Sequence, residues 1–190
     1  MRNVMVDLET LGQSAGCIVL SIGAVCFDES GIVGTDFYSV IGAASSDKHG
    51  LFADESTVAW WNKQGPEARK VLEEARDSTA ELPDVLRLFA EWLPRDPFIW
   101  GNGAGFDNPI LARLYSVAGL PLPWKFWNER CYRTLASLYP MVPPERKRVG
   151  TFHNALDDAK TQAIHASKIL RYRDELFAAK LAASAGATAP

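Results

Sequence analysis

Residues 4–10, VMVDLET, form the stretch that decides the fold. Three apolar residues precede Asp7, as is typical of a buried β-strand. Successive side chains of a strand point to opposite faces, so Asp7 and Glu9 project together while Leu8 points into the core. Two adjacent carboxylates repel each other unless a cation neutralises them, and hard oxygen ligands suit Mg²⁺ or Mn²⁺. Because this short pattern is common, a strand that ends in two solvated acids is the alternative.

A second segment, FIWGNGAGFDNPIL, occupies residues 98–111. Its first three residues predict a short buried strand, its glycines a turn, and Pro109 the first turn of a helix that begins near residue 108. Asp107 therefore lies at a helix N-terminus, where it is either a simple N-cap or another acidic ligand. The glycine spacing lacks the rest of a dinucleotide-binding fingerprint.

The third segment is HNALDDAK, at residues 153–160. Apolar residues follow it at helical spacing, so a helix is predicted from about Asn154, with His153 on the loop just before it. A loop histidine with a pKa near neutrality suits proton transfer. Asp157 and Asp158 both lie about one turn into this helix, and periodicity does not choose between them. The other two histidines, His49 and His165, are interpreted as structural or exposed.

Together the three segments supply acidic groups that could hold two Mg²⁺ ions, with a histidine beside them as general base, which is the equipment for cutting phosphodiester bonds. DLET, NGAGFDNPIL and HNALDDA, in this order, resemble the motifs of the DEDDh branch of the 3′–5′ exonuclease superfamily. The resemblance covers roughly residues 3–172 and is similar to small single-domain phage and bacterial members, as is TVAWWNKQ at residues 57–64. It implies a ribonuclease-H-like α/β fold, a mixed central sheet flanked by helices.

The resemblance also implies a role for each residue. The last motif of the family is His, four residues, then Asp, which assigns Asp158 rather than Asp157. The implied catalytic residues are Asp7, Glu9, Asp107, His153 and Asp158, and the four acids among them are the implied metal ligands. Asp7 would bridge two divalent cations ~4 Å apart. Glu9 and Asp158 would hold the ion beside the attacking water, His153 would accept a proton, and Asp107 would support the second ion. Mg²⁺ is the implied cofactor, Mn²⁺ could substitute, and the product is a nucleoside 5′-monophosphate.

Four residues are candidates for substrate binding. In the family, the positions after the first motif reach the terminal nucleotide, which implies a backbone contact at Thr10 and an apolar wedge at Leu11. One of two adjacent tryptophans could stack on a base, and Trp61 is interpreted as the exposed one. Phe106 is a candidate wall of the pocket. Each aromatic residue could instead belong to the core.

The rest of the chain predicts strands and helices in an order that fits this fold. Strands are predicted at 4–8, 18–27, 32–40, 98–100 and 125–127, the second and third forming a hairpin, and helices at 56–61, 66–74, 79–93, 109–117, 131–138 and 154–177. Residues 42–54 and 140–150 are predicted loops. The exonuclease domain is expected to span residues 1–177, and residues 178–190 to form a flexible tail of small residues.

Composition restricts the function less than the motifs do. The chain has 190 residues, of which 47% are apolar and 23% charged, with a net charge of −3. Arg146-Lys147-Arg148 is either a phosphate grip at the mouth of the site or a solvated loop. The three cysteines show no metal-ligand spacing, and an odd number of them without a secretion signal predicts reduced thiols in a cytoplasm. No stretch is long and apolar enough to span a membrane.

Three functions remain open from the sequence. A Mg²⁺-dependent 3′–5′ exonuclease acting on single-stranded DNA 3′ ends is favoured, because the motifs are similar to those of phage-type members. An exoribonuclease would use the same chemistry. A catalytically silent nucleic-acid binding module would keep the fold, but the complete set of five catalytic residues argues against it. The resemblance also implies a homodimer as a form to test.

Overall fold

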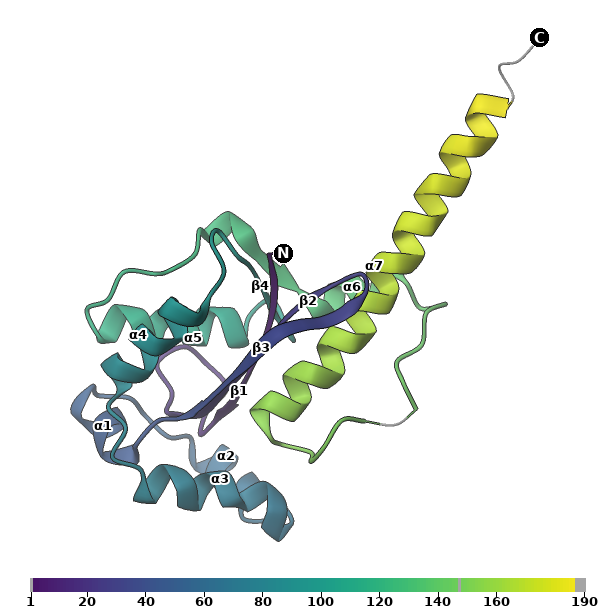
Figure 1. Ribbon diagram of the computed structural model, residues 1–190. Coiled ribbons are helices and arrows are strands. Elements are labelled where there is room, and N and C mark those ends of the chain that lie inside the picture. Colours follow the sequence, from purple (N-terminus) through teal and green to yellow (C-terminus); the bar gives the residue numbers. More distant parts are fainter. Residues whose placement is uncertain (1, 147, 187–190) are drawn as a thin grey trace.

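The centre of the molecule is a five-stranded sheet with the order β3-β2-β1-β4-β5 (Figure 1). The computed structural model describes residues 2–146 and 148–186. β1 pairs antiparallel with β2 and parallel with β4, so the sheet is mixed, as predicted. The strands are β1 (Asn3–Thr10), β2 (Val19–Asp28), β3 (Gly31–Val40), β4 (Phe98–Gly101) and β5 (Glu129–Cys131).

The predicted hairpin is confirmed, because β2 and β3 pair antiparallel through the short turn at residues 28–31. Asp28 Oδ1 accepts hydrogen bonds from the backbone N–H of Ser30 at 2.8 Å and from its hydroxyl at 2.5 Å. Gly31 has a φ of 134°, which favours glycine over any other residue. The four predicted strands at 4–8, 18–27, 32–40 and 98–100 are all present, each with ends within two residues of the prediction.

Helices cover both faces of this sheet, and the side-chain alternation of β1 explains which face receives which helix. Val4, Val6 and Leu8 belong to the core cluster that also contains α4 and α5, whereas Met5 packs with α7. Asp7 and Glu9 share the face of Met5. The helices are α1 (Ala43–Lys48), α2 (Glu55–Trp61), α3 (Pro66–Asp77), α4 (Leu82–Trp92), α5 (Asp107–Val117), α6 (Tyr132–Leu138) and α7 (Ala155–Gly186).

Two local predictions were wrong. The predicted loop at 42–54 contains α1, which tertiary contacts stabilise, since the Ser45 hydroxyl donates to Glu81 and accepts from the backbone N–H of Leu82. The strand predicted at 125–127 is replaced by a 3-10 helix, η1 (Phe126–Asn128). The side chains of Phe126 and Trp127 are exposed, so no buried face selects a strand there, and sheet pairing begins at Glu129, opposite Ile99.

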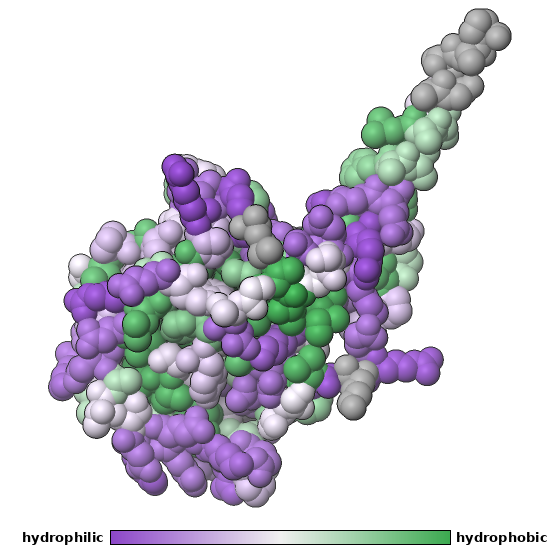
Figure 2. Space-filling model, in the orientation of Figure 1, coloured by the Kyte–Doolittle hydropathy of each residue, from purple (hydrophilic) through white to green (hydrophobic). Residues whose placement is uncertain are grey.

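α7 is longer than predicted and projects from the body of the molecule (Figure 1). The helix was predicted to end near residue 177 but continues to Gly186, and residues 187–190 lie outside the described part of the chain. Four alanines between residues 178 and 183 favour this extension, since alanine has the highest helix propensity. Figure 2 shows hydrophobic residues gathered towards the described end of the projecting helix. Among the described residues, none of the helices has the length and apolarity that crossing a membrane requires.

Candidate active site

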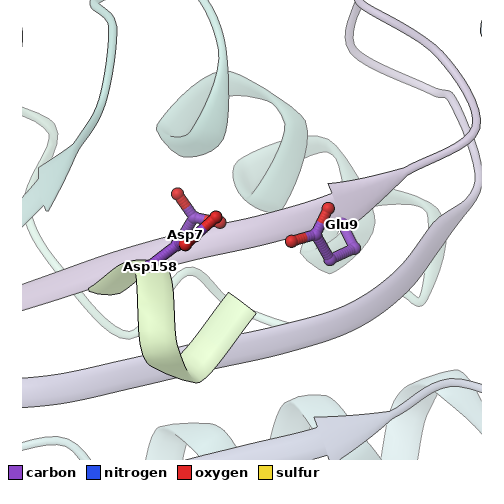
Figure 3. A group of neighbouring side chains, drawn as sticks. All are labelled: Asp7, Glu9 and Asp158. Carbon is purple, nitrogen blue, oxygen red and sulfur yellow. The ribbon is translucent and has the colours of Figure 1, made fainter. Parts of the chain in front are cut away.

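Three carboxylates from distant parts of the sequence meet where β1 passes the first turn of α7. One ligand oxygen each of Asp7, Glu9 and Asp158 lies within 4.8 Å of the other two. Figure 3 shows Asp7 and Glu9 on the same strand, with Asp158 of α7 beside Asp7. We call these three residues the carboxylate cluster. Their geometry could hold hard divalent cations.

A glycine in β2 allows α7 to come this close to the sheet. Gly23 pairs with Asp7 across the antiparallel strands. A Cβ atom at Gly23 would collide with the backbone of Ala155 and Leu156, the first two residues of α7. The helix therefore begins directly against the strand pair, and this contact places Asp158 beside Asp7.

Hydrogen bonds at the start of α7 give its two adjacent aspartates different environments. Asn154 Oδ1 accepts from the backbone N–H groups of Leu156 and Asp157, both at 3.1 Å, and so caps the helix. Asp157 turns to the preceding loop, where its carboxylate accepts from the N–H of Thr151 at 2.8 Å. Asp158 faces the carboxylate cluster instead. Only the position of the helix on the sheet distinguishes the two residues.

Asp107 adds a fourth acidic group at the first residue of α5. It is buried, and its Oδ2 accepts from the backbone N–H of Asn102 at 2.7 Å. Its charge raises the pKa of both Asp7 and Glu9, so it is electrostatically part of the same site. The N–H groups at the start of the helix favour a negative charge at this position.

Burial makes the acidic site electrostatically unfavourable for the protein alone. Removal from water, and then the neighbouring carboxylates, raise the pKa of Asp7 well above its ordinary value. The same causes raise the pKa of Glu9 to about 8, and burial raises that of Asp107 to about 6. Glu9 Oε1 is also buried without a hydrogen-bond partner. Bound divalent cations would offset both the repulsion and the missing contacts, so these residues fit the metals that the motifs imply.

His153 lies beside the carboxylate cluster, in the loop before α7. Its φ of 60° is a left-handed conformation that residues other than glycine rarely adopt and that often marks functional positions. Its ring packs edge-on against Trp60, with ring centres 4.9 Å apart. Burial and the charge of Arg148 lower the pKa of His153, so the imidazole is neutral near pH 7 and able to accept a proton.

The other two histidines have structural contacts, as interpreted from the sequence. His165 is buried in α7, where its ring nitrogens lie 2.7 Å from the Tyr132 hydroxyl and 2.7 Å from the carbonyl oxygen of Val142. His49 Nδ1 lies 2.8 Å from the carbonyl oxygen of Ser45.

A cleft of about 590 Å³ opens beside the carboxylate cluster. The residues that line it include the cluster, His153 and three candidates for substrate binding, Thr10, Trp61 and Phe106. Leu11 is not among the lining residues, because its side chain packs in a core cluster with Leu20. The wedge role of Leu11 stays a prediction.

The choice between the two tryptophans was wrong. Trp61 is 2% exposed, and its indole N–H donates to the carbonyl oxygen of Thr10 at 2.8 Å. Trp60 is 41% exposed and presents its ring in the cleft. Both rings lie on one short helix, and only the packing of α2 against the core decides which of them is buried.

Two further residues of the site, Gln162 and Gly23, were not identified from the sequence. The amide of Gln162 donates to Asp7 Oδ1 at 2.7 Å, and its spacing of four residues from Asp158 is a helical signal that could have revealed it. Gly23 carries no local signal, since its role depends on α7. Of the basic residues at 146–148, Arg148 pairs with Asp158, Arg146 is exposed, and Lys147 lies outside the described residues.

Three acidic residues and His153 line one cleft, and the charge of a fourth acid, Asp107, acts on them. On a mixed sheet flanked by helices, this arrangement is typical of a nuclease of the DEDDh type. The comparisons with known proteins agree. A family model described as a 3′–5′ exoribonuclease Rv2179c-like domain matches residues 2–170. The chain belongs to this family and is a 3′–5′ exonuclease by membership.

A phage relative and two solved structures are also similar to this chain. An exodeoxyribonuclease of Enterobacteria phage T4 is 29% identical over 161 residues, covering 70% of each protein. Exonuclease X, solved with 5′ overhanging duplex DNA, has a TM-score of 0.58 at 16% identity. The nuclease domain of 3′hExo, a DEDDh family member solved with rAMP, has a TM-score of 0.59 at 11% identity. Each alignment covers 90% of this chain and 92% of the solved one, so the ribonuclease-H-like fold is confirmed.

Proposed function

We propose that this protein removes nucleotides from the 3′ end of single-stranded nucleic acid by a mechanism with two divalent metal ions, releasing nucleoside 5′-monophosphates. The observation that carries the proposal is the meeting of Asp7, Glu9 and Asp158 within 4.8 Å at a cleft that also contains His153. Nuclease family membership and divalent-metal dependence agree with this geometry. Mg²⁺ is the proposed ion, because all candidate ligands are carboxylate oxygens.

The proposed roles follow from position. The carboxylate cluster, supported by Asp107, would hold the ions, which supply charge stabilisation of the phosphodiester and activation of water. Gln162 orients Asp7 through its hydrogen bond. His153 accepts the proton of the attacking water, since its lowered pKa keeps the imidazole neutral.

The terminal nucleotide is proposed to lie in the cleft between Trp60 and Phe106. Trp60 offers an exposed ring face, and stacking tolerates any base. Thr10 contributes its backbone at the floor of the cleft, where its carbonyl is fixed by Trp61 and its hydroxyl donates to the carbonyl oxygen of Gly12 at 2.7 Å.

We propose DNA as the preferred substrate, and RNA as the second candidate. The phage relative, 29% identical, is named an exodeoxyribonuclease, which supports DNA. The matching family model is described as an exoribonuclease domain, which supports RNA. The chemistry of the carboxylate cluster is the same for both sugars.

The test is degradation of 5′-labelled single-stranded DNA and RNA of one sequence, each with Mg²⁺, with Mn²⁺ and with EDTA. We expect a ladder that shortens from the 3′ end with either metal and no products with EDTA. Asp7→Ala is expected to lower the rate by roughly 10³-fold or more while the protein stays folded. The faster of the two substrates decides between DNA and RNA.

Two results would contradict the proposal. Full activity of Asp7→Ala would show that the carboxylate cluster is not the reaction centre. Binding of both nucleic acids without cleavage in any metal would favour a silent binding module.

Three broader expectations accompany the proposed activity. Reduced thiols support a cytoplasmic location, and Cys17, Cys26 and Cys131 are all unpaired. A homodimer stays a prediction, which light scattering on the eluted protein would check. The division into an exonuclease domain at 1–177 and a flexible tail at 178–190 also stays a prediction, and limited proteolysis would test it.

A further inference from the structure

Arg148 is the basic residue that contacts the carboxylate cluster. It lies in the loop between α6 and α7, and its Nη2 forms an ion pair with Asp158 Oδ1. The side chain of Arg148 is 25% exposed and that of Asp158 is 15% exposed, so the pair is largely shielded from solvent. The guanidinium carbon lies 4.1 Å from the centre of the Phe152 ring, which supports it from one side.

The charge of Arg148 lowers the pKa of several groups that take part in the proposed reaction. It lowers the pKa of Asp7 and Glu9, against the larger opposing effect of their burial. It also lowers the pKa of His153. Arg148 is therefore close to both the proposed metal ligands and the proposed base.

Arg148 has hydrogen-bonding capacity that the protein itself does not use. Its Nε is buried and has no hydrogen-bond partner among the residues that the structure describes. Arg133, near Asp107, differs in this respect because its guanidinium donates to the carbonyl oxygen of Asn102 at 2.8 Å. A planar guanidinium with unused donors matches the oxygens of a phosphate group, which it can bind through two parallel hydrogen bonds.

The charge balance of the site indicates a role for the positive charge of Arg148. Two divalent ions would neutralise the four carboxylates of Asp7, Glu9, Asp107 and Asp158, and the substrate would then bring a further negative phosphate group. Divalent cations would also compete with Arg148 for Asp158, because like charges repel at one carboxylate. The ion pair seen here would then give way, and the guanidinium would remain next to Asp158, which lines the cleft.

We propose that Arg148 binds the phosphate group of the terminal nucleotide, and that Asp158 holds this side chain until a divalent cation takes the carboxylate. This inference rests on the proposed function, since it concerns the substrate of the same site. It makes Arg148 a positioning residue for the phosphate, whereas the exposed Arg146 of the same loop has no such contact.

Binding measurements without turnover test this proposal. Calorimetry would give the Mn²⁺ affinity of the wild type, Arg148→Gln and Arg148→Lys, and then the affinity for thymidine 5′-monophosphate and for thymidine at saturating Mn²⁺. Arg113→Gln is the matched control, because it removes one positive charge from an exposed position on α5.

We expect Arg148→Gln to bind Mn²⁺ more tightly, because Asp158 loses its competing partner. The same variant should bind thymidine 5′-monophosphate roughly 10- to 100-fold more weakly, the range for a lost hydrogen-bonded charge contact. Its affinity for thymidine should not change, since thymidine carries no phosphate. Arg148→Lys should lie between, and Arg113→Gln should equal the wild type.

Equal affinity of Arg148→Gln and the wild type for thymidine 5′-monophosphate would overturn the inference. A loss of affinity for thymidine as large as that for the monophosphate would also overturn it, because it would indicate a distorted cleft. An unchanged Mn²⁺ affinity of Arg148→Gln would overturn the proposal that a divalent cation replaces Arg148 at Asp158. A wild-type protein that binds no Mn²⁺ and cleaves nothing would instead refute the proposed function, independently of any variant at Arg148.

Discussion

Burial gives individual acidic residues of this protein chemistry that they would not have in water. Glu9 is 6% exposed and Asp107 1% exposed, and their carboxylates lie near like charges. The same buried negative charges would stabilise a divalent cation bound between them. The same principle applies to His153, whose lowered pKa comes first from burial and then from Arg148.

The two tryptophans of α2 are expected to respond differently to substitution. Trp60→Ala should weaken binding of single-stranded nucleic acid by about 1–3 kcal/mol, the range for one base–aromatic contact, with little change in stability. Trp61→Ala should lower the free energy of unfolding by about 3–5 kcal/mol, because its ring is in the core. Fluorescence titration and chemical denaturation of both variants check this. Stronger destabilisation by Trp60→Ala than by Trp61→Ala would reverse the assignment.

His153 provides a second test at the scale of one residue. His153→Ala should lower kcat by roughly 10²- to 10⁴-fold, the usual contribution of a general base. Mn²⁺ affinity should be largely retained, since the carboxylate cluster is intact. Single-turnover kinetics and calorimetry measure the two quantities separately. Lost metal affinity with a normal chemical step would show that His153 is not the base.

At the scale of elements, the contact between β2 and α7 organises the site. Gly23 lies opposite Asp7 on one side and against the first residues of α7 on the other. β1, β2 and the start of α7 therefore meet at Gly23. The position of Asp158 depends on this close approach more than on any side-chain contact of its own.

Gly23→Ala should therefore impair both stability and catalysis. The added methyl group would push the start of α7 away from the sheet, at a cost of about 1–3 kcal/mol for an overpacked site. It would also separate Asp158 from Asp7 and weaken Mn²⁺ binding. Gly65→Ala is the control, because a Cβ there meets nothing within 4 Å. Thermal unfolding and Mn²⁺ titration measure the effects, and equal behaviour of the two variants would refute the role of Gly23.

At the scale of the whole molecule, the acidic site couples folding to pH and metal. The folded protein keeps a proton on Glu9 up to a pKa of about 8, whereas the ordinary value is 4.5. Between these two pH values the unfolded chain loses that proton first, so rising pH favours unfolding. Below pH 4.5 Glu9 is protonated in both the folded and the unfolded state, so it no longer makes stability depend on pH.

We therefore expect the metal-free protein to lose stability as pH rises from about 5 to 8, through the carboxyl of Glu9 and with a contribution of the same sign from Asp7. Added Mn²⁺ should raise the melting temperature more at pH 8 than at pH 5, since binding requires ionised carboxylates. Calorimetric scans in EDTA and in Mn²⁺ check both trends. A metal-free protein that becomes more stable over this range would contradict the account of burial.

The sequence by itself determined the strand with its paired acids, the hairpin, the order of the helices and the identity of the candidate catalytic residues. Local periodicity and motif spacing carry this information. Asp7 and Glu9 share a face because strand geometry alternates side chains, whatever surrounds the strand. The resemblance to DEDDh exonucleases followed from the same motifs, and the family comparison confirmed it.

Only the tertiary structure decided which neighbouring residue serves the site. It buried Trp61 and exposed Trp60, and it brought Gly23 and Arg148 to the carboxylate cluster. The physical reason is that these outcomes depend on how α2 and α7 pack on the sheet, through contacts between residues distant in the sequence, such as Trp61 with Thr10 and Ala155 with Gly23. No local pattern contains that information.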